Sequence, residues 1–323
     1  MKITEENFVG PYKEPFGGYI KFKRAAGQSI CQGVICKLNA LSAFLTEIHP
    51  STVCMTQADI EQFLLRTNGH KSSTRAGYES MIRQLGMYLR NCGYNDIHIL
   101  PEGITKSGTD FVPYVFSENE IVRILRATDN LDWYRDKAST GLFYRVLVRL
   151  LYSTGLRIDE ALGLHVSSVD LENRIITVHK SKGGTSRLVP YDESLHKWLM
   201  EYLTQVGRHD DNYFFRSPRN ERYAVVTVQW MFKNKLLPAA GIVPAVGQRI
   251  SLHSLRHTFA CHSLNKMIEN GKDSFCTLPY LSTYLGHVNI ESSEIYLRLT
   301  KERFTGILDA CVGTYEGRLS DEK

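Results

Sequence analysis

The feature that most constrains this fold is a break in helical periodicity between two long helical stretches. Before the break, apolar side chains recur every three or four residues from Ile30 to Ile48, again after Thr56, and again after the hydroxyl cluster at 72–74. From 99 to 115 the pattern disappears, and this is unusually long for a connection inside one compact domain. The sequence therefore predicts two domains joined by a linker.

The second half of the chain combines helices with a hairpin. Ser117 and Glu120 have the spacing of a capping box, which predicts a helix start. The segments 174–179 and 186–189 flank a polar, glycine-bearing stretch and predict two antiparallel strands. Further helices are predicted at 140–153, 157–164, 193–205, 226–237, 254–269, 277–286, 291–298 and 301–311. The expected fold class is mainly α, with a small antiparallel β-sheet in the second domain.

These boundaries divide the chain into five segments. We expect an N-terminal extension at 1–19, a helical domain at 20–98, a linker at 99–115, a mixed and mainly α domain at 116–313, and a tail at 314–323. With 323 residues in all, each domain is long enough to bury its own core. Hydrophobic and charged shares of 43% and 23% exclude a disordered or fibrous chain.

The composition favours a protein of the cytoplasm. No apolar run approaches the ~20 residues of a membrane span, and the N-terminus lacks the basic and apolar regions of a signal peptide. The seven cysteines include no C-x-x-C pair, as expected of reduced thiols. The net charge of +5 is compatible with a polyanionic partner, although charge alone does not identify one.

Six residues of the second domain form the candidate active site. They are Arg157, Lys182, His253, Arg256, His287 and Tyr296. Two arginine forks suit an anionic phosphate, and no carboxylate cluster suited to Mg²⁺ accompanies them. Lysine or histidine can protonate a leaving oxygen, and the tyrosine is the candidate nucleophile. The set predicts phosphoryl transfer with neither a metal nor another cofactor.

This ordered pattern resembles the tyrosine recombinases, the phage-integrase family of site-specific DNA recombinases. The family pattern of arginine, hairpin lysine, H-x-x-R, G-H and a tyrosine nine residues later is matched by the six residues above. Glu160 matches the acidic position that supports the site, and Lys180 competes with Lys182 for the hairpin position. The first domain, with its segment SSTRAGYESMIRQLGMYLR, resembles the family's core-binding domain.

The resemblance implies a mechanism and partners. Tyr296 would attack the scissile phosphate of double-stranded DNA, giving a 3′-phosphotyrosyl bond and a free 5′-hydroxyl. His253 would accept the tyrosine proton, and both arginines would stabilise the transition state. Lys182 would protonate the leaving oxygen, while His287 would donate to a non-bridging oxygen. Exchange would need a homo-tetramer on two specific DNA sites and a Holliday junction, with accessory or directionality proteins as further partners.

Basic residues of the first domain are candidate DNA contacts. Lys71, Arg75, Arg83 and Arg90 lie in or beside the third predicted helix, and only Glu79 opposes their charge. A solvated helix face is the alternative interpretation. We favour contact with DNA phosphates, because a two-domain clamp around a duplex requires the first domain to touch the backbone.

One departure from the family pattern, and the lack of one family module, bear on the biological role. The spacing between Arg256 and His287 is several residues longer than is common, and the extra residues near 270–274 predict a surface loop. No small module of the arm-binding type is evident before residue 20. The longer loop favours integration or excision of a mobile element over resolution of chromosome dimers.

Other interpretations stay open. A type IB topoisomerase uses a similar site, and a catalytically silent DNA-binding regulator would keep the same fold. His253, His257 and Cys261 are spaced like metal ligands on one helical face. A helix that starts at Ser254 would turn His253 away from the other two, which leaves His257 and Cys261 as core residues.

The last helical segment, TKERFTGILDACVG, carries an apolar stripe. The stripe consists of Phe304, Ile307, Leu308 and Cys311. It packs either onto its own domain or, as the resemblance suggests, into a neighbouring protomer. In the second case it would link cleavage by Tyr296 to assembly.

Overall fold

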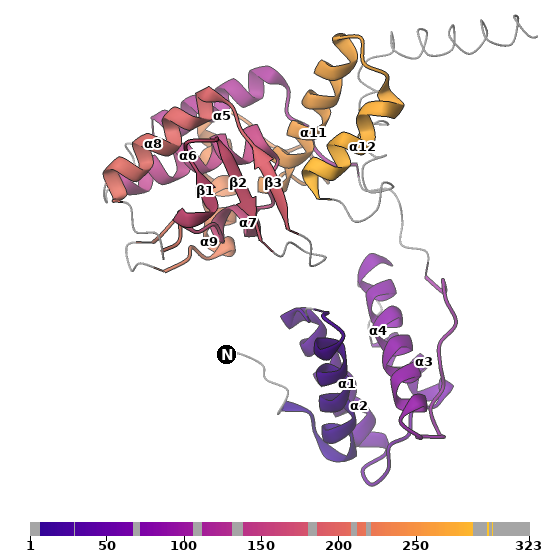
Figure 1. The fold of residues 1–323 in the computed structure, drawn as a ribbon. Helices are drawn as coiled ribbons and strands as arrows, with labels where there is room; N and C mark the ends of the chain where they lie inside the picture. Colours follow the sequence, from indigo (N-terminus) through magenta and orange to yellow (C-terminus); the bar gives the residue numbers. More distant parts are fainter. Residues whose placement is uncertain are drawn as a thin grey trace, which may run out of the picture. The chain divides into compact units, whose positions relative to one another are not determined.

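The computed structural model describes residues 7–28, 30–66, 72–105, 112–130, 138–179, 186–207, 212–217 and 221–286, together with Tyr296 and Leu299. The chain divides into two compact units, residues 1–111 and 112–323 (Figure 1). This division falls inside the predicted linker at 99–115. The fold is mainly α with one small antiparallel sheet, so the predicted fold class is confirmed.

The described part of the first unit is helical. Its elements are η2 (Gly10–Tyr12), α1 (Lys13–Ala25), α2 (Gln32–Ile48), α3 (Gln57–Leu65) and α4 (Ser72–Asn91). Thr56 caps α3 in a reciprocal capping box with Asp59, as its position before the periodic segment predicts. Apolar side chains from all of these elements meet in one core.

The start of this unit differs from the sequence prediction. The predicted extension at 1–19 overlaps η2 and half of α1, and Phe8, Tyr12 and Phe16 are buried in the core of the unit. The rings of Tyr12 and Phe16 meet edge to face at 5.5 Å. Prolines and glycines in this segment hide the helical pattern, but Pro15 lies in the first turn of α1, where proline is tolerated.

The second unit mixes helices with the sheet. Its helices are α5 (Glu118–Asp129), α6 (Ala138–Thr154), α7 (Ile158–Leu162), η3 (Val166–Ser168), α8 (Glu193–Val206), α9 (Val225–Met231), the π-helical turn η4 (Phe232–Leu236), α10 (Leu237–Ala239), α11 (Leu252–Glu269) and α12 (Ser274–Leu285). The long apolar helix α6 packs against α5, α8 and α11, and α11 packs against α12 (Figure 1). Helix α6 is therefore the central element of this unit.

The sheet has the order β1 (Val169–Asp170), β2 (Ile175–Val178) and β3 (Arg187–Pro190), and both pairs are antiparallel. Val169 pairs with Ile176, which pairs with Val189, and this row faces the core. The predicted hairpin supplies β2 and β3. Strand β1 was not predicted, because two residues are too few for an alternating pattern to show.

Several helix boundaries also differ from the sequence prediction. Helix α11 begins at Leu252 instead of 254, and α12 begins at Ser274 instead of 277. The π-helical turn at Phe232–Leu236 interrupts the predicted helix at 226–237. Apart from Tyr296, the predicted helices at 291–298 and 301–311 lie outside the described residues. Of the helices that are described, none combines the length and apolar character needed to cross a membrane.

Candidate active site

The first part of the site lies where α6 ends and α7 begins. Gly155 follows α6 with a φ of 60°, and a Cβ there would clash with the ring of Phe259, so this turn requires glycine. Arg157 is the N-cap of α7, and its backbone N–H donates to Oε2 of Glu160 over 3.0 Å. Its Nη1 donates to Oε1 of Glu160 over 2.8 Å. One carboxylate therefore holds both the backbone and the side chain of Arg157.

Glu160 has a second arginine partner, Arg187 on β3. Nη1 and Nη2 of Arg187 donate to Oε1 and Oε2 of Glu160 over 3.0 and 2.7 Å. Burial raises the pKa of Glu160, but the hydrogen bonds from Arg187 and Arg157 and the charge of Arg187 outweigh it and bring the pKa to about 2. Glu160 is therefore a carboxylate at neutral pH, and it neutralises part of the charge of the two guanidinium groups.

Arg256 is a buried cation on α11, with 1% of its surface exposed. Its Nη1 donates to the carbonyl of Gly155, and its Nη2 donates to the carbonyl of Leu285, each over 2.7 Å. Burial and the charge of Arg157 lower the pKa of Arg256 to about 10. The group stays protonated at neutral pH, and it ties the turn after α6 to the end of α12.

Three arginines bind three consecutive carbonyls at the C-terminal end of α12. Nε of Arg187 donates to Tyr284 over 2.9 Å, Nη2 of Arg256 donates to Leu285, and Nη2 of Arg157 donates to Gly286 over 3.3 Å. The last carbonyls of a helix lack intrahelical partners and carry the negative end of its dipole. The carbonyls of this turn therefore accept hydrogen bonds from all three arginines, and the three positive charges lie close together as a result.

Tyr296 is buried, with 2% of its surface exposed. Burial raises the pKa of its hydroxyl, while the charge of Arg256 and a hydrogen bond from it oppose that increase. The ring packs in a small apolar cluster whose other buried members are Val115, Ala260, Cys261, Leu264, Leu281 and Leu285. The structure thus brings together Arg157, Glu160, Arg256 and Tyr296 out of the predicted site residues.

The predicted base, His253, lies in the first turn of α11 and is exposed. Ser251 caps this helix, so His253 belongs to it and does not precede it as predicted. Its ring lies 4.6 Å from the ring of His257, and the ring of His257 lies 5.7 Å from that of Tyr296. The expectation that His253 turns away from His257 is therefore wrong, because the helix starts two residues earlier than predicted.

The structure also bears on the alternative metal site. Among the described residues, the group with donor atoms close enough to share a metal is His49, Cys54 and Asp59 in the first unit, and the α11 residues are not part of it. Oδ2 of Asp59 already accepts from Nε2 of His49 over 2.9 Å and from the backbone and hydroxyl of Thr56 over 2.8 Å each. A hydrogen bond from His49 and the cap of α3 therefore account for the carboxylate of this group.

Other predicted site residues lie outside the described residues. These are Lys71, Lys180, Lys182 and His287. Of the α4 arginines, Arg75 donates to the buried carboxylate of Glu79 over 3.2 Å, Arg83 to the carbonyl of Pro101 over 3.3 Å, and Arg90 to that of Ile97 over 2.9 Å. Each of these cations already has an intramolecular partner, so their contact with DNA stays a proposal.

Sequence reasoning missed Arg187, although a signal for it exists. Residues two apart in a strand face the same side, so Arg187 shares the inward face of β3 with the buried Val189. Leu188 between them is 61% exposed. An arginine on the same face of a strand as a buried valine predicts a partner inside the domain, and Glu160 is that partner.

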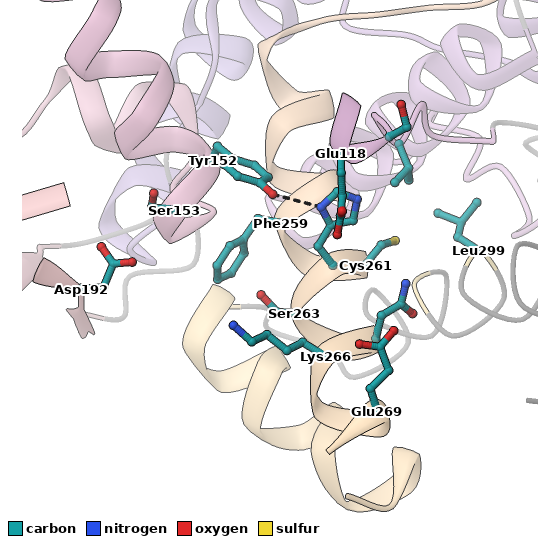
Figure 2. A pocket seen from close by; sticks show the side chains of 14 residues that line it. Glu118, Tyr152, Ser153, Asp192, Phe259, Cys261, Ser263, Lys266, Glu269 and Leu299 are labelled. Atoms are coloured by element: carbon teal, nitrogen blue, oxygen red, sulfur yellow. Dashed lines mark hydrogen bonds between the residues drawn. The ribbon is translucent and has the colours of Figure 1, made fainter. Parts of the chain in front are cut away.

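A separate hollow of about 690 Å³ lies beside α11. Figure 2 shows side chains from α5, α6 and α11 around it, and the hydroxyl of Tyr152 lies 3.1 Å from Nδ1 of His262. Leu299 and Cys261 also line it. Cys261 also packs in the apolar cluster that buries Tyr296. A group bound in this hollow would therefore contact a residue of that cluster.

The fold and these contacts define a protein that gathers arginines beside a buried tyrosine, an arrangement suited to an anionic phosphate. The model of the phage integrase family matches residues 115–303. An integrase/recombinase of Sinorhizobium fredii, y4rB, is 33% identical over 194 residues, 57% of this chain and 61% of that protein. Tyrosine recombinase XerD of Neisseria meningitidis is 30% identical over 253 residues, 75% of this chain and 77% of that protein.

Among solved structures, the XerH site-specific recombinase in a post-cleavage complex with its difH substrate has a TM-score of 0.66. Its sequence identity is 20%, and the match covers 88% of this chain and 80% of that one, which supports the fold. The chain belongs to the phage integrase family, and it is a tyrosine recombinase, one of a class of DNA strand-transferring enzymes. The resemblance seen in the sequence is confirmed.

Proposed function

We propose that this chain is a site-specific DNA recombinase that cuts and rejoins strands through a 3′-phosphotyrosyl bond on Tyr296. The observation that carries the proposal is the convergence of Arg157 and Arg256 on the Leu285–Gly286 turn, with Arg256 also hydrogen-bonded to Tyr296. Cations fixed beside a nucleophile stabilise the charge that develops on a phosphate during attack. His287, the next residue along the chain, follows this turn directly.

The proposed chemistry needs no external energy source. The phenolic oxygen of Tyr296 attacks phosphorus, the bond from phosphorus to the 5′-oxygen breaks, and the phosphate stays joined to the protein. His253 takes the phenolic proton, and Lys182 gives a proton to the leaving 5′-oxygen. A 5′-hydroxyl from the partner strand then attacks the phosphotyrosine and gives its proton to Lys182, while the departing oxygen of Tyr296 takes back a proton from His253, so bonds and protons are both conserved.

Burial of Tyr296 favours regulated cleavage. Only 2% of the surface of Tyr296 is exposed. Its hydroxyl can therefore reach a DNA phosphate only after the side chains around it rearrange. Burial also raises the pKa of the hydroxyl, which disfavours its charged form before the phosphate arrives. We propose that a homo-tetramer on two double-stranded sites supplies this rearrangement, and that the reaction passes through a Holliday junction.

For the biological role we propose integration or excision of a mobile element, with accessory proteins setting direction. Its support is the longer spacing between Arg256 and His287. DNA as the substrate implies action in the cytoplasm, on the nucleoid. A library of DNA fragments incubated with the protein, followed by sequencing of the covalently trapped ends, would identify the site. Ends at the boundary of a mobile element are expected, and ends at one chromosomal site would favour dimer resolution.

A nicked suicide substrate tests the proposed function. Wild-type protein is expected to form a covalent DNA adduct that resists boiling in detergent, and Tyr296→Phe is expected to bind DNA without forming it. Tyr280→Phe is the matched control, because this tyrosine is 75% exposed. Loss of the adduct in both variants, or its persistence in Tyr296→Phe, would overturn the assignment. The adduct should also form in EDTA, because no role in the proposal is given to a metal.

The alternatives give different results. A type IB topoisomerase would relax supercoiled DNA that lacks a specific site, without a partner duplex. A silent regulator would bind DNA and give no adduct. We favour recombination because the alignment with XerD covers 75% of this chain, which is more than the second unit alone and so extends into the proposed core-binding domain.

A further inference from the structure

Arg187 connects three segments of the proposed active site. It lies on β3 and donates to both carboxylate oxygens of Glu160 on α7 and to the carbonyl of Tyr284 at the end of α12. Its side chain is 10% exposed. Sheet, helix α7 and helix α12 therefore meet at one guanidinium group.

The geometry at Glu160 shows how Arg187 acts on Arg157. A bidentate contact between a guanidinium and a carboxylate fixes the orientation of the carboxylate plane as well as the distance between the two groups. The same two oxygens of Glu160 accept from the side chain and the backbone N–H of Arg157. The orientation of Arg157 therefore depends on a carboxylate whose plane Arg187 holds.

The side chain of Arg187 also packs closely against Gly286, in the turn that precedes His287. Gly286 has a φ of 67°, and a Cβ there would lie 3.0 Å from both Cδ and Nη1 of Arg187. The glycine both permits the backbone conformation and leaves room for the guanidinium. With Arg157 and Arg256, Arg187 completes the row of donors to the carbonyls of residues 284 to 286.

We propose that Arg187 is a positioning residue of this active site, which sets the orientation of Arg157 through Glu160 and fixes the turn before His287. The inference rests on the proposed function, because its consequence is a faster cleavage step. It does not make Arg187 a contact of the DNA. A purely structural ion pair would instead stabilise the fold and leave the chemical step unchanged.

Single-turnover cleavage at saturating protein tests the inference. Arg187→Gln is expected to slow cleavage by ~10-fold or more with little change in DNA affinity, because a small misplacement of a catalytic group can cost up to ~10²-fold. Arg187→Lys keeps the charge without the planar fork and is expected to recover part of the rate. Arg174→Gln is the matched control, because Arg174 forms an exposed ion pair with Glu193 and is expected to cleave like wild type.

The pH profile separates positioning from a general loss of structure. Without Arg187, burial acts on Glu160 against one arginine only, so the pKa of Glu160 rises. The rate of Arg187→Gln relative to wild type should therefore fall as the pH decreases, and this dependence should weaken in Arg187→Lys. In a Glu160→Gln background, Arg187→Gln should cost much less, because its target is already gone.

The outcomes are distinguishable. If wild-type protein forms no adduct, the proposed function fails. If wild type forms the adduct while Arg187→Gln cleaves at the wild-type rate, only the positioning role fails. An equal cost of Arg187→Gln with and without Glu160 overturns the orientation of Arg157 through Glu160. If Arg187→Gln does not fold, Arg187→Lys provides the same comparison with Glu160→Gln.

Discussion

Nη2 of Arg256 donates to the main-chain carbonyl of Leu285 over 2.7 Å, although the two residues are 29 positions apart. Leu285 ends α12, and the next two residues are Gly286 and His287. Arg256, which is 1% exposed, thus fixes the end of α12, from which the chain continues toward the predicted site residues His287 and Tyr296. The residue that is expected to stabilise the transition state also builds the framework around it.

Arg256→Ala is expected to reduce the rate of adduct formation by at least ~10²-fold, because a donor to the transition state is lost. It also leaves the carbonyls of Gly155 and Leu285 without this partner, so the free energy of unfolding should fall by about 1–3 kcal/mol. Arg157→Ala should lose as much activity with a smaller loss of stability, because its side chain is 22% exposed. Single-turnover cleavage and urea unfolding measure the two effects, and near wild-type cleavage in either variant would remove that arginine from the site.

The pKa of Glu160, about 2 in the folded chain, predicts how stability depends on acid. Because this pKa lies below the ordinary value of 4.5, the carboxylate stabilises the fold above about pH 4.5, and the stabilisation is lost as pH falls toward about 2. The contribution at neutral pH is on the order of 3 kcal/mol. Unfolding of wild type and Glu160→Gln between pH 7 and pH 4 should show their difference shrinking below about pH 5. A difference that is constant with pH would contradict this pKa.

The sequence predicts local structure better than it predicts partners across the fold. Ser117 and Glu120 form the capping box that their spacing predicts, and Thr56 caps α3 at the predicted position, with Asp59 as a partner that was not predicted. Arg187 and Glu160 are separated by 27 residues, and their contact depends on how β3 packs beside α7. Hydrophobic periodicity does not encode that packing, so the site could be predicted as a set of residues but not as a network of contacts.

The two units should separate when the chain is cut within 106–111. Each has its own buried core, so two folded fragments are expected. If both units contact phosphates of one duplex, each fragment should bind DNA more weakly than the intact chain, with a smaller dependence of log affinity on log salt. Titration at several salt concentrations measures this. Full affinity in the fragment 112–323 would show that the first unit, with Arg75, Arg83 and Arg90, is not a DNA clamp.

Deletion of residues 302–323 tests the proposed link between assembly and cleavage. The deleted segment contains the apolar stripe from Phe304 to Cys311, and the hollow beside α11 is lined by Leu299 and by Cys261, which packs in the cluster around Tyr296. A stripe supplied by a neighbouring protomer gives a head-to-tail interface, which closes into a ring when its rotation permits.

The truncated protein is therefore expected to fold and to bind a single half-site like the intact chain, because both cores and the arginine contacts are retained. It should lose cooperative binding to a full site in a gel-shift titration and lose regulated cleavage with it. Tyr296→Phe in the intact chain is the control, since it removes cleavage while keeping assembly. If the truncated chain does not fold, or binds full sites as cooperatively as the intact chain, the stripe packs on its own domain and the assembly mechanism is wrong.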